Sequence, residues 1–209
     1  MYHEFNKAMA FRHACKIFDE SKSISHGDLN FILEAGRTSP SSFGMEGWKL
    51  LVITNEALKA EIRPACWNQV QITSCSHLVV ILSAIDTLKP SSGIPQARFS
   101  RRPLSQEQLD GYVELYSNHL SETLSSDENI YHWSARQSYI AMANMMTAAA
   151  YIGIDSCPIE GFDKEEVEKI LDLDTTQWQV SALMPIGYRL NAQSTQLRRT
   201  FEEVVEFIS

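Results

Sequence analysis

The sequence predicts an α/β fold in which helices cover a small central sheet. Three short runs are almost wholly apolar and have the length of buried strands, at residues 49–54, 77–84 and 179–188. The longer segments between them carry apolar residues at helical spacing. Helices mixed with a few buried strands indicate an α/β sandwich. Because 209 residues suffice for one sizeable core, we expect a single domain over residues 1–209.

Local start and stop signals delimit the expected helices. Ser25 and Asp163 are typical N-cap residues, and Gly153 is a typical residue just beyond a helix C-terminus. Residues 38–47 and 88–104 are rich in Ser, Pro and Gly, so we expect loops there, the second a candidate mobile lid. Helices are expected at residues 6–15, 25–36, 56–65, 70–75, 105–124, 129–151 and 163–171.

The helix expected at residues 129–151 has an unusual body. Residues 140–150 are apolar on nearly all sides. Such a helix is buried over most of its surface, either in a core or in a subunit interface. Its apolarity exceeds what one small domain can cover, so it favours a large interface between subunits.

Charge and composition exclude several classes of protein. The formal net charge is −8 and the pI is about 5.2, which argues against a nucleic acid or an anionic membrane as partner. Residues 1–11 lack the basic start and apolar core of a secretory signal. No apolar run approaches the roughly 18 to 20 residues that cross a bilayer. We therefore expect a cytoplasmic protein.

Reactive side chains give few local signals. The four cysteines include no Cys-x-x-Cys pair and the six histidines are dispersed, so we expect free buried thiols and no metal site. No Gly-x-Gly-x-x-Gly follows a strand, and there is neither a Walker-type loop nor a nucleophile elbow. A hydrolase or a metalloenzyme is therefore not indicated.

Two basic clusters stand out in this acidic chain. Arg12, His13 and Lys16 lie close together near the start, and Arg198 and Arg199 lie near the end. Each cluster is either solvated surface or part of a shared phosphate site, because arginines at distant positions can converge on one phosphate. The residues alone leave both alternatives open.

Residues 153–163 contain few reactive side chains, and their useful feature is a backbone held in a restricted conformation. They follow the long apolar helix, and Pro158 and Gly161 restrict the chain to a loop with a short strand. Exposed N–H and C=O groups in such a segment can meet a flat heteroaromatic ligand. The segment resembles the flavin-facing loop of the FMN-dependent nitroreductase family in Cys157, Pro158, Ile159, Glu160 and Gly161.

The resemblance extends to the N-terminal basic cluster. It implies that Arg12 grips the FMN phosphate and that Lys16 lies near the flavin N1 and C2 carbonyl, where a cation favours reduced flavin. His13 belongs to the same motif, and Ala14 replaces the usual Ser. The backbone N–H of Glu160 would point at flavin N5, the atom that accepts and gives hydride.

The C-terminal segment is similar to a second phosphate-binding motif of the family. Arg198 takes the position of the phosphate-binding Arg, and Arg199 is a further candidate. Gln196 stands where a Lys is usual. The resemblance therefore implies that phosphate neutralisation depends on Arg12 and Arg198, which could weaken FMN binding.

The loop at residues 38–47 resembles the family's Ser-Pro-Ser-Ser loop, which reaches the flavin of the other subunit. Gly44 stands where many members carry Asn, so that contact should be absent, and Gly47 stands where most carry Pro. Without the resemblance, this segment would be interpreted as a plain turn. The matching residues are Ser39, Pro40, Ser41 and Ser42.

A further match lies just before the second predicted strand. Asn68 would meet the pyrimidine edge of the flavin, and Gln71 lies where some members have Lys. Trp67 would line the substrate cleft, with Phe43 donated by the partner subunit. The alternative for Trp67 is packing in the core.

Together these matches, over about residues 10–205, imply a mostly antiparallel central sheet flanked by helices in an interwoven homodimer, with two FMN sites at the interface. The implied activity is that of an FMN-dependent NAD(P)H oxidoreductase. It would reduce nitroaromatics, quinones or related acceptors by two electrons in a ping-pong cycle, with NADH or NADPH as donor. No acid–base side chain is implied.

Three alternatives stay open. The first is a flavin-binding or flavin-handling protein of the same fold without NAD(P)H turnover. The second is a dimeric scaffold that has lost FMN, which the replacements at Ala14, Gly44, Gln71 and Gln196 make conceivable. The third is reductive dehalogenation on the same fold.

Overall fold

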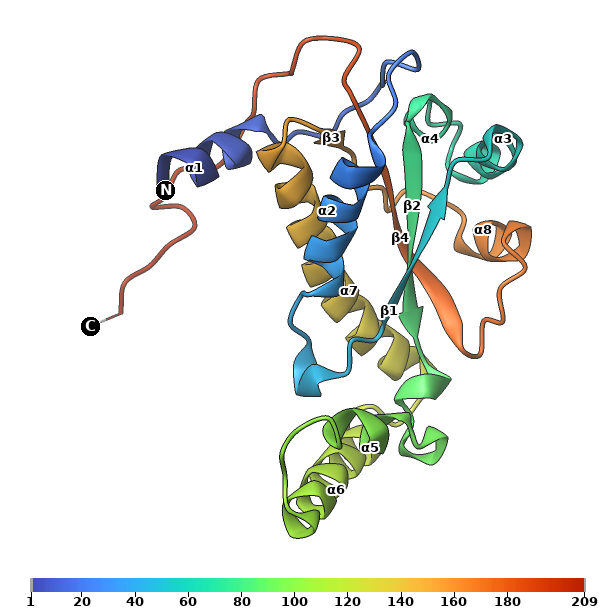
Figure 1. Cartoon of the computed structure of the whole chain (residues 1–209), viewed down its shortest axis with the longest axis vertical. Helices are drawn as coiled ribbons and strands as arrows, with labels where there is room; N and C mark the ends of the chain where they lie inside the picture. The colour runs from blue at the N-terminus through green and yellow to red at the C-terminus, as the bar shows by residue number, and fades with distance from the viewer. Residues whose placement is uncertain (1, 209) are drawn as a thin grey trace.

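The computed structural model describes residues 2–208 and is built on a four-stranded sheet (Figure 1). The strands lie in the order β1-β2-β4-β3, and every neighbouring pair is antiparallel. The predicted antiparallel sheet flanked by helices is thus confirmed. The strands are β1 (Trp48–Ile53), β2 (His77–Ala84), β3 (Asp155–Ser156) and β4 (Trp178–Gly187).

The two central strands are buried on both faces. Residues 78–84 of β2 and 180–187 of β4 are all buried, whereas β1 is an edge strand and is only partly covered. Because helices cover both faces of the sheet, the central strands read as continuous apolar runs rather than as alternating ones. A register shift between Ile81 and Leu82 marks a bulge where β2 pairs with β4.

Helices form one layer on each face of the sheet (Figure 1). Helices α2 (His26–Arg37) and α7 (Asp127–Tyr151) cover one face, where Ile32 and Met145 pack against Ile81. The opposite face is covered by α3, α4 and α8, where Ile62 and Val167 pack in a second core. These three helices span Glu56–Ala65, Gln71–Ser74 and Lys164–Ile170.

A third hydrophobic cluster lies beyond one end of the sheet, at the bottom of Figure 1. Helices α5 (Ile94–Phe99) and α6 (Gln106–Thr123) meet the start of α7 there, around Phe99, Tyr116 and Trp133. Short 3-10 turns span Ser42–Gly44, Asp86–Leu88 and Pro90–Ser92. Helix α1 (Tyr2–Phe11) lies at the other end of the molecule, near the C-terminal end of α7.

The predicted helix caps are confirmed. The side chain of Ser25 accepts from the Asp28 N–H at 3.1 Å, and that of Asp163 accepts from the Glu166 N–H at 3.1 Å. Gly153 follows α7 with φ +78°, a left-handed conformation that glycine adopts without strain.

The first helix was predicted at residues 6–15 but spans Tyr2–Phe11, and the long helix begins two residues earlier than the predicted 129. The first helix ends at Phe11 rather than at residue 15, because Ala14 and Cys15 instead pair with Ser156. The long helix begins at Asp127, since the Ser126 hydroxyl caps it by accepting from the Asn129 N–H. Local pattern could not show the long-range pairing, whereas Ser126 followed by Asp127 and Glu128 is a local N-cap signal that the prediction overlooked.

Residues 88–104 are more regular than predicted. They contain α5, and both Leu88 and Phe99 are fully buried. The Tyr116 hydroxyl donates to the Leu88 carbonyl at 2.6 Å, which ties the segment to α6. The many Ser, Pro and Gly residues concealed a short helix that tertiary packing stabilises.

The apolar body of α7 remains partly uncovered. Met145 and Ala149 are fully buried, as expected, but Ile140 is 38 % exposed and Tyr151 is 60 % exposed. Within residues 2–208, no helix combines the length and apolarity that crossing a bilayer requires. The four cysteines are buried and free, in agreement with the prediction.

Close packing of α2 on α7 generates a test of the fold. A Cβ on Gly36 would lie 2.8 Å from both Cγ and Sδ of the fully buried Met145. We expect Gly36→Ala to lower the free energy of unfolding by about 1–3 kcal/mol through overpacking. The matched variant Gly27→Ala lies in the same helix, where a Cβ would meet nothing closer than 3.9 Å. It should be neutral or stabilising by up to about 1 kcal/mol. Urea unfolding measures both, and equal effects would contradict the described packing.

Candidate functional site

Backbone pairing places residues 12–16 beside residues 157–161. Ala14 forms a parallel bridge with Ser156, and the Cys15 N–H donates to the Ser156 carbonyl at 3.2 Å. These segments, which are about 140 positions apart in the chain, therefore lie side by side. Residues 157–161 are called the 157–161 loop below.

The 157–161 loop is anchored along one side only. Ile159 exchanges both backbone hydrogen bonds with Leu183 of β4, at 2.8 and 3.1 Å. Because successive N–H groups of an extended chain point to opposite sides, the Glu160 N–H points away from β4. Across residues 2–208 this N–H finds no acceptor. It is therefore available to a ligand.

The turn between α3 and α4 braces this loop. A Cβ on Gly161 would lie 2.5 Å from Trp67 Cζ3, so the indole ring rests on this glycine. The Gln69 amide donates to the Gly161 carbonyl at 2.8 Å, and Gln71 donates to the Gln69 side chain at 2.9 Å. Trp67 is 71 % exposed, so the core-packing alternative is wrong.

Asn68 is held by its backbone and leaves its side chain free. Trp67 and Asn68 both have φ +55°, and two left-handed residues in succession make a tight turn. Arg63 Nε donates to the Asn68 carbonyl at 3.2 Å, and the Asn68 N–H donates to the Arg63 carbonyl at 3.1 Å. In the described part of the chain, the Asn68 side-chain amide has no hydrogen-bond partner.

A cation and a thiol meet at the start of the 157–161 loop. Lys16 Nζ lies 3.9 Å from Cys157 Sγ, and Gln71 Nε2 lies 3.8 Å from the same sulfur. Burial raises the pKa of the Cys157 thiol, and Lys16 opposes this effect. Burial likewise raises the pKa of Cys15 to about 11. Both thiols are therefore neutral near pH 7 and poor nucleophiles, while exposed Lys16 contributes positive charge.

Arg12 reaches from the end of α1 onto α7. Its Nη1 donates to Thr147 Oγ1 at 3.1 Å. Its Nε is buried and lacks a hydrogen-bond partner among residues 2–208. Because a buried donor without a partner is costly, this arrangement fits an anionic ligand. Sequence reasoning missed Thr147, which is hidden in the apolar run of the long helix.

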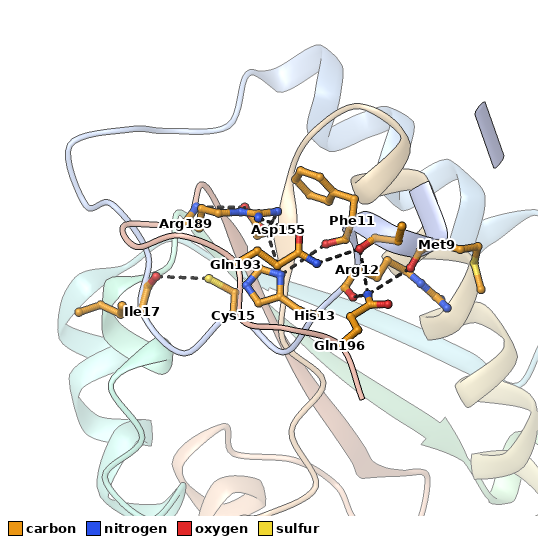
Figure 2. Close-up of polar contacts among 11 residues, drawn as sticks. Met9, Phe11, Arg12, His13, Cys15, Ile17, Asp155, Arg189, Gln193 and Gln196 are labelled. Atoms are coloured by element: carbon orange, nitrogen blue, oxygen red, sulfur yellow. Dashed lines mark hydrogen bonds and ion pairs between the residues drawn. The ribbon is translucent and has the colours of Figure 1, made fainter. Parts of the chain in front are cut away.

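A buried carboxylate links both sides of the site (Figure 2). The side chain of Asp155 is only 3 % exposed, and its Oδ1 forms an ion pair with Arg189 Nη2 at 2.7 Å, without hydrogen-bond geometry. Its Oδ2 accepts from Arg189 Nε at 3.0 Å and from the Arg189 N–H at 3.1 Å. His13 Nδ1 lies 3.5 Å from Asp155 Oδ1, so the imidazole faces this carboxylate. Sequence reasoning missed the Asp155–Arg189 pair, although a carboxylate directly after apolar Ile154 was a signal in the sequence.

The loop at residues 38–47 packs on the outward side of α7. Asn144 Nδ2 donates to Ser39 Oγ at 2.8 Å, and the Ser42 N–H donates to Gln137 Oε1 at 3.0 Å. Ser41 Oγ accepts from the Glu46 N–H at 2.8 Å, and Pro40 is exposed. Asn144 precedes Thr147 by three positions, so Ser39 lies about one helical turn from Arg12.

Phe43 lies apart from the other predicted site residues within this chain. The Phe43 ring packs 5.2 Å from that of Tyr116, in the cluster at the far end of the molecule from α4. Arg198 and Arg199 are exposed on the tail that follows β4. Gln196, two positions before Arg198, bonds to the Arg12 carbonyl, so the tail passes close to Arg12.

A hollow of about 470 Å³ opens beside α7, near Glu160. The Tyr139 hydroxyl donates to the Ser181 carbonyl at 3.2 Å. Burial, and then the neighbouring Glu160 carboxylate, raises the pKa of Tyr139. Sequence reasoning did not identify this hollow, because its lining combines residues of α7 with Ser181 of β4. The lining residues are Tyr131, His132, Ala135, Arg136, Tyr139 and Ser181.

Known proteins resemble this chain along its whole length. The model of the Nitroreductase family matches residues 9–188. A Bacillus subtilis (strain 168) protein named "Putative NAD(P)H nitroreductase YfkO" is 38 % identical over 212 residues, which cover 96 % of each chain.

Solved structures share the fold. A nitroreductase-like protein from Streptococcus mutans superposes over 100 % of both chains, with a TM-score of 0.89 and 17 % identity. A protein from Exiguobacterium sibiricum 255-15, in complex with FMN, has a TM-score of 0.82 and 22 % identity over 97 % of this chain and 96 % of its own. With the family model matching most of the chain and a relative 38 % identical along nearly all of it, this chain belongs to the nitroreductase family.

Proposed function

We propose that the protein is an FMN-dependent NAD(P)H oxidoreductase that reduces nitroaromatics, quinones or related small acceptors by two electrons. Bound FMN would supply the hydride chemistry between NADH or NADPH and the acceptor in a ping-pong cycle. One observation carries the proposal: the unpartnered Nε of Arg12 and the free N–H of Glu160 lie on neighbouring segments. The name of the Bacillus subtilis relative and the FMN complex of the Exiguobacterium sibiricum protein support it.

The residues present fit FMN at both of its ends. A phosphate would give buried Arg12 Nε a charge-assisted partner. A flat ring would meet the outward N–H of Glu160, the free amide of Asn68 and the positive charge of Lys16. Cys157, Pro158 and Ile159 would supply backbone rather than reactive groups at that ring.

The protein residues would orient and tune the cofactor rather than exchange protons with the substrate. Lys16 would stabilise negative charge on the reduced ring. Glu160 is exposed, so its carboxylate is solvated. Its backbone N–H, rather than its side chain, would contact the flavin ring. No side chain is assigned as acid or base, because solvent reaches the outer side of the loop and can supply the protons.

We also propose that the protein is a homodimer with FMN sites at its interface. The outward side of α7 exposes Ile140 and Tyr151. The tail extends away from the body in Figure 1 and exposes several large apolar residues. Covering both surfaces on a second copy would remove them from water. The exposed tail residues are Leu197, Phe201, Val204, Phe207 and Ile208.

The visible spectrum tests the cofactor and the reaction together. The purified protein, or the protein incubated with FMN, should show two flavin bands. NADH or NADPH added without oxygen should bleach them, and a nitroaromatic or a quinone should restore them. A yellow protein that neither donor bleaches would instead support a flavin-binding role without turnover. A protein that stays colourless with FMN would support a scaffold that has lost the cofactor.

Lys16 provides a test of how the protein tunes the ring. Replacing Lys16 with Met should lower the two-electron reduction potential of bound FMN by roughly 20–30 mV, because reduced flavin loses about 1 kcal/mol of charge stabilisation. Lys169→Met removes the same charge from an exposed position on α8 and serves as the control. Equal potentials in the Lys16 variant and the control would contradict the assigned role.

The oligomeric state tests the proposed interface. The protein should sediment as a dimer at micromolar concentration. Ile140→Glu should shift it towards monomer, since a carboxylate would be buried in the interface. The control Lys169→Glu changes the charge on the opposite face of the sheet and should leave the dimer intact. A wild-type protein that sediments as a monomer would contradict the proposed dimer.

A further inference from the structure

The end of α1 is held by two glutamine side chains from the tail (Figure 2). The two N–H groups of Gln196 Nε2 are shared among three carbonyls, those of Met9 at 3.3 Å, Ala10 at 3.0 Å, and Arg12. Gln193 Nε2 donates to the Ala10 carbonyl at 2.8 Å. The last carbonyls of a helix have no partner within the helix. Gln193 and Gln196, called the amide clasp below, satisfy those of Met9 and Ala10.

Arg189, which lies where the tail leaves β4, orients Gln193 of the amide clasp. This start of the tail is called its root below. Arg189 Nη1 donates to Gln193 Oε1 at 3.1 Å, which turns the amide nitrogen of Gln193 towards α1. Arg189 is itself fixed by buried Asp155 and lies over the Phe11 ring, 4.1 Å from its centroid. A continuous chain of contacts thus runs from β3 through the tail to the residue before Arg12.

Arg12 is held both at its backbone and at the end of its side chain. Its carbonyl accepts from Gln196, and its N–H donates to the Ala8 carbonyl at 3.2 Å. Its guanidinium donates to Thr147, while Nε stays free. With its backbone held by Gln196 and its side-chain end held by Thr147, Arg12 presents a preorganised donor, which reduces the ordering cost of binding an anion.

We propose that Gln196 and Gln193 are positioning residues for the phosphate of FMN, and that they act through Arg12. Gln196 carries no charge, so its contribution is the placement of the Arg12 backbone rather than attraction of the anion. This inference rests on the proposed function. It gives the root of the tail a role in cofactor affinity, although these two side chains bond to the protein and not to the cofactor site.

Titration of the apoprotein with FMN and with riboflavin, which lacks the phosphate, tests the amide clasp. Gln196→Met keeps the length of the side chain and removes its donors. It should weaken FMN binding about five- to tenfold, as expected when one or two net hydrogen bonds are lost, and leave riboflavin binding unchanged. The control Gln96→Met alters an exposed glutamine on α5, at the other end of the molecule, and should change neither.

A double-mutant cycle with Arg12→Ala separates positioning from general stability. If Gln196 acts through Arg12, Gln196→Met should have little further effect on FMN affinity once Arg12 is Ala. Full additivity, an equal loss of FMN and riboflavin affinity, or no loss at all would overturn the amide clasp. Failure of the wild-type protein to bind FMN would instead overturn the proposed function. Unfolding midpoints confirm that each variant is folded.

Discussion

Asp155 places a carboxylate where only 3 % of its side chain meets solvent, and the arrangement of the site depends on how that charge is satisfied. A buried charge is tolerated only when it is paired and hydrogen-bonded, and removing one partner costs several kcal/mol. Arg189 supplies the guanidinium and a backbone N–H, and His13 faces the same carboxylate. One interaction therefore joins β3, the segment after α1 and the root of the tail.

Each functional segment lies within a few residues of that junction. The 157–161 loop follows Asp155 directly, Arg12 precedes His13, and the amide clasp follows Arg189. Backbone pairing of Ala14 with Ser156 keeps the first two segments in register. The free donors of Arg12 and Glu160 are thus placed by the same contacts that hold the sheet edge together, so the proposed function couples cofactor affinity to local stability in this part of the fold.

The sequence correctly predicted those features of the fold that depend on local pattern, such as strand bounds and helix caps. The bounds of β2 agree with the apolar run at residues 77–84, and the caps at Ser25 and Asp163 follow from their hydrogen-bonding chemistry. Pairing between distant segments could not be predicted from the sequence, and the first helix was therefore extended over Ala14 and Cys15. Helix α5 was missed because its stability comes from Phe99 packing in a distant cluster rather than from its own composition.

For the site, resemblance indicated which segments meet but not what holds them. It identified Arg12, Lys16 and the 157–161 loop, and the structure brings these together. It described Gln196 only as a missing cation, whereas the structure shows an amide bonded to the end of α1. The roles of Thr147, Arg189 and Gln193 depend on contacts with residues 34 to 183 positions away in the chain, which no local motif encodes.

The most direct test of this account is a crystal structure of the protein grown with FMN. The account predicts that the phosphate accepts a hydrogen bond from Arg12 Nε, that the ring lies against the Glu160 N–H, and that the contacts between Asp155 and Arg189 are unchanged. A flavin bound elsewhere, or a phosphate on Arg198 and Arg199 with Arg12 turned away, would contradict it.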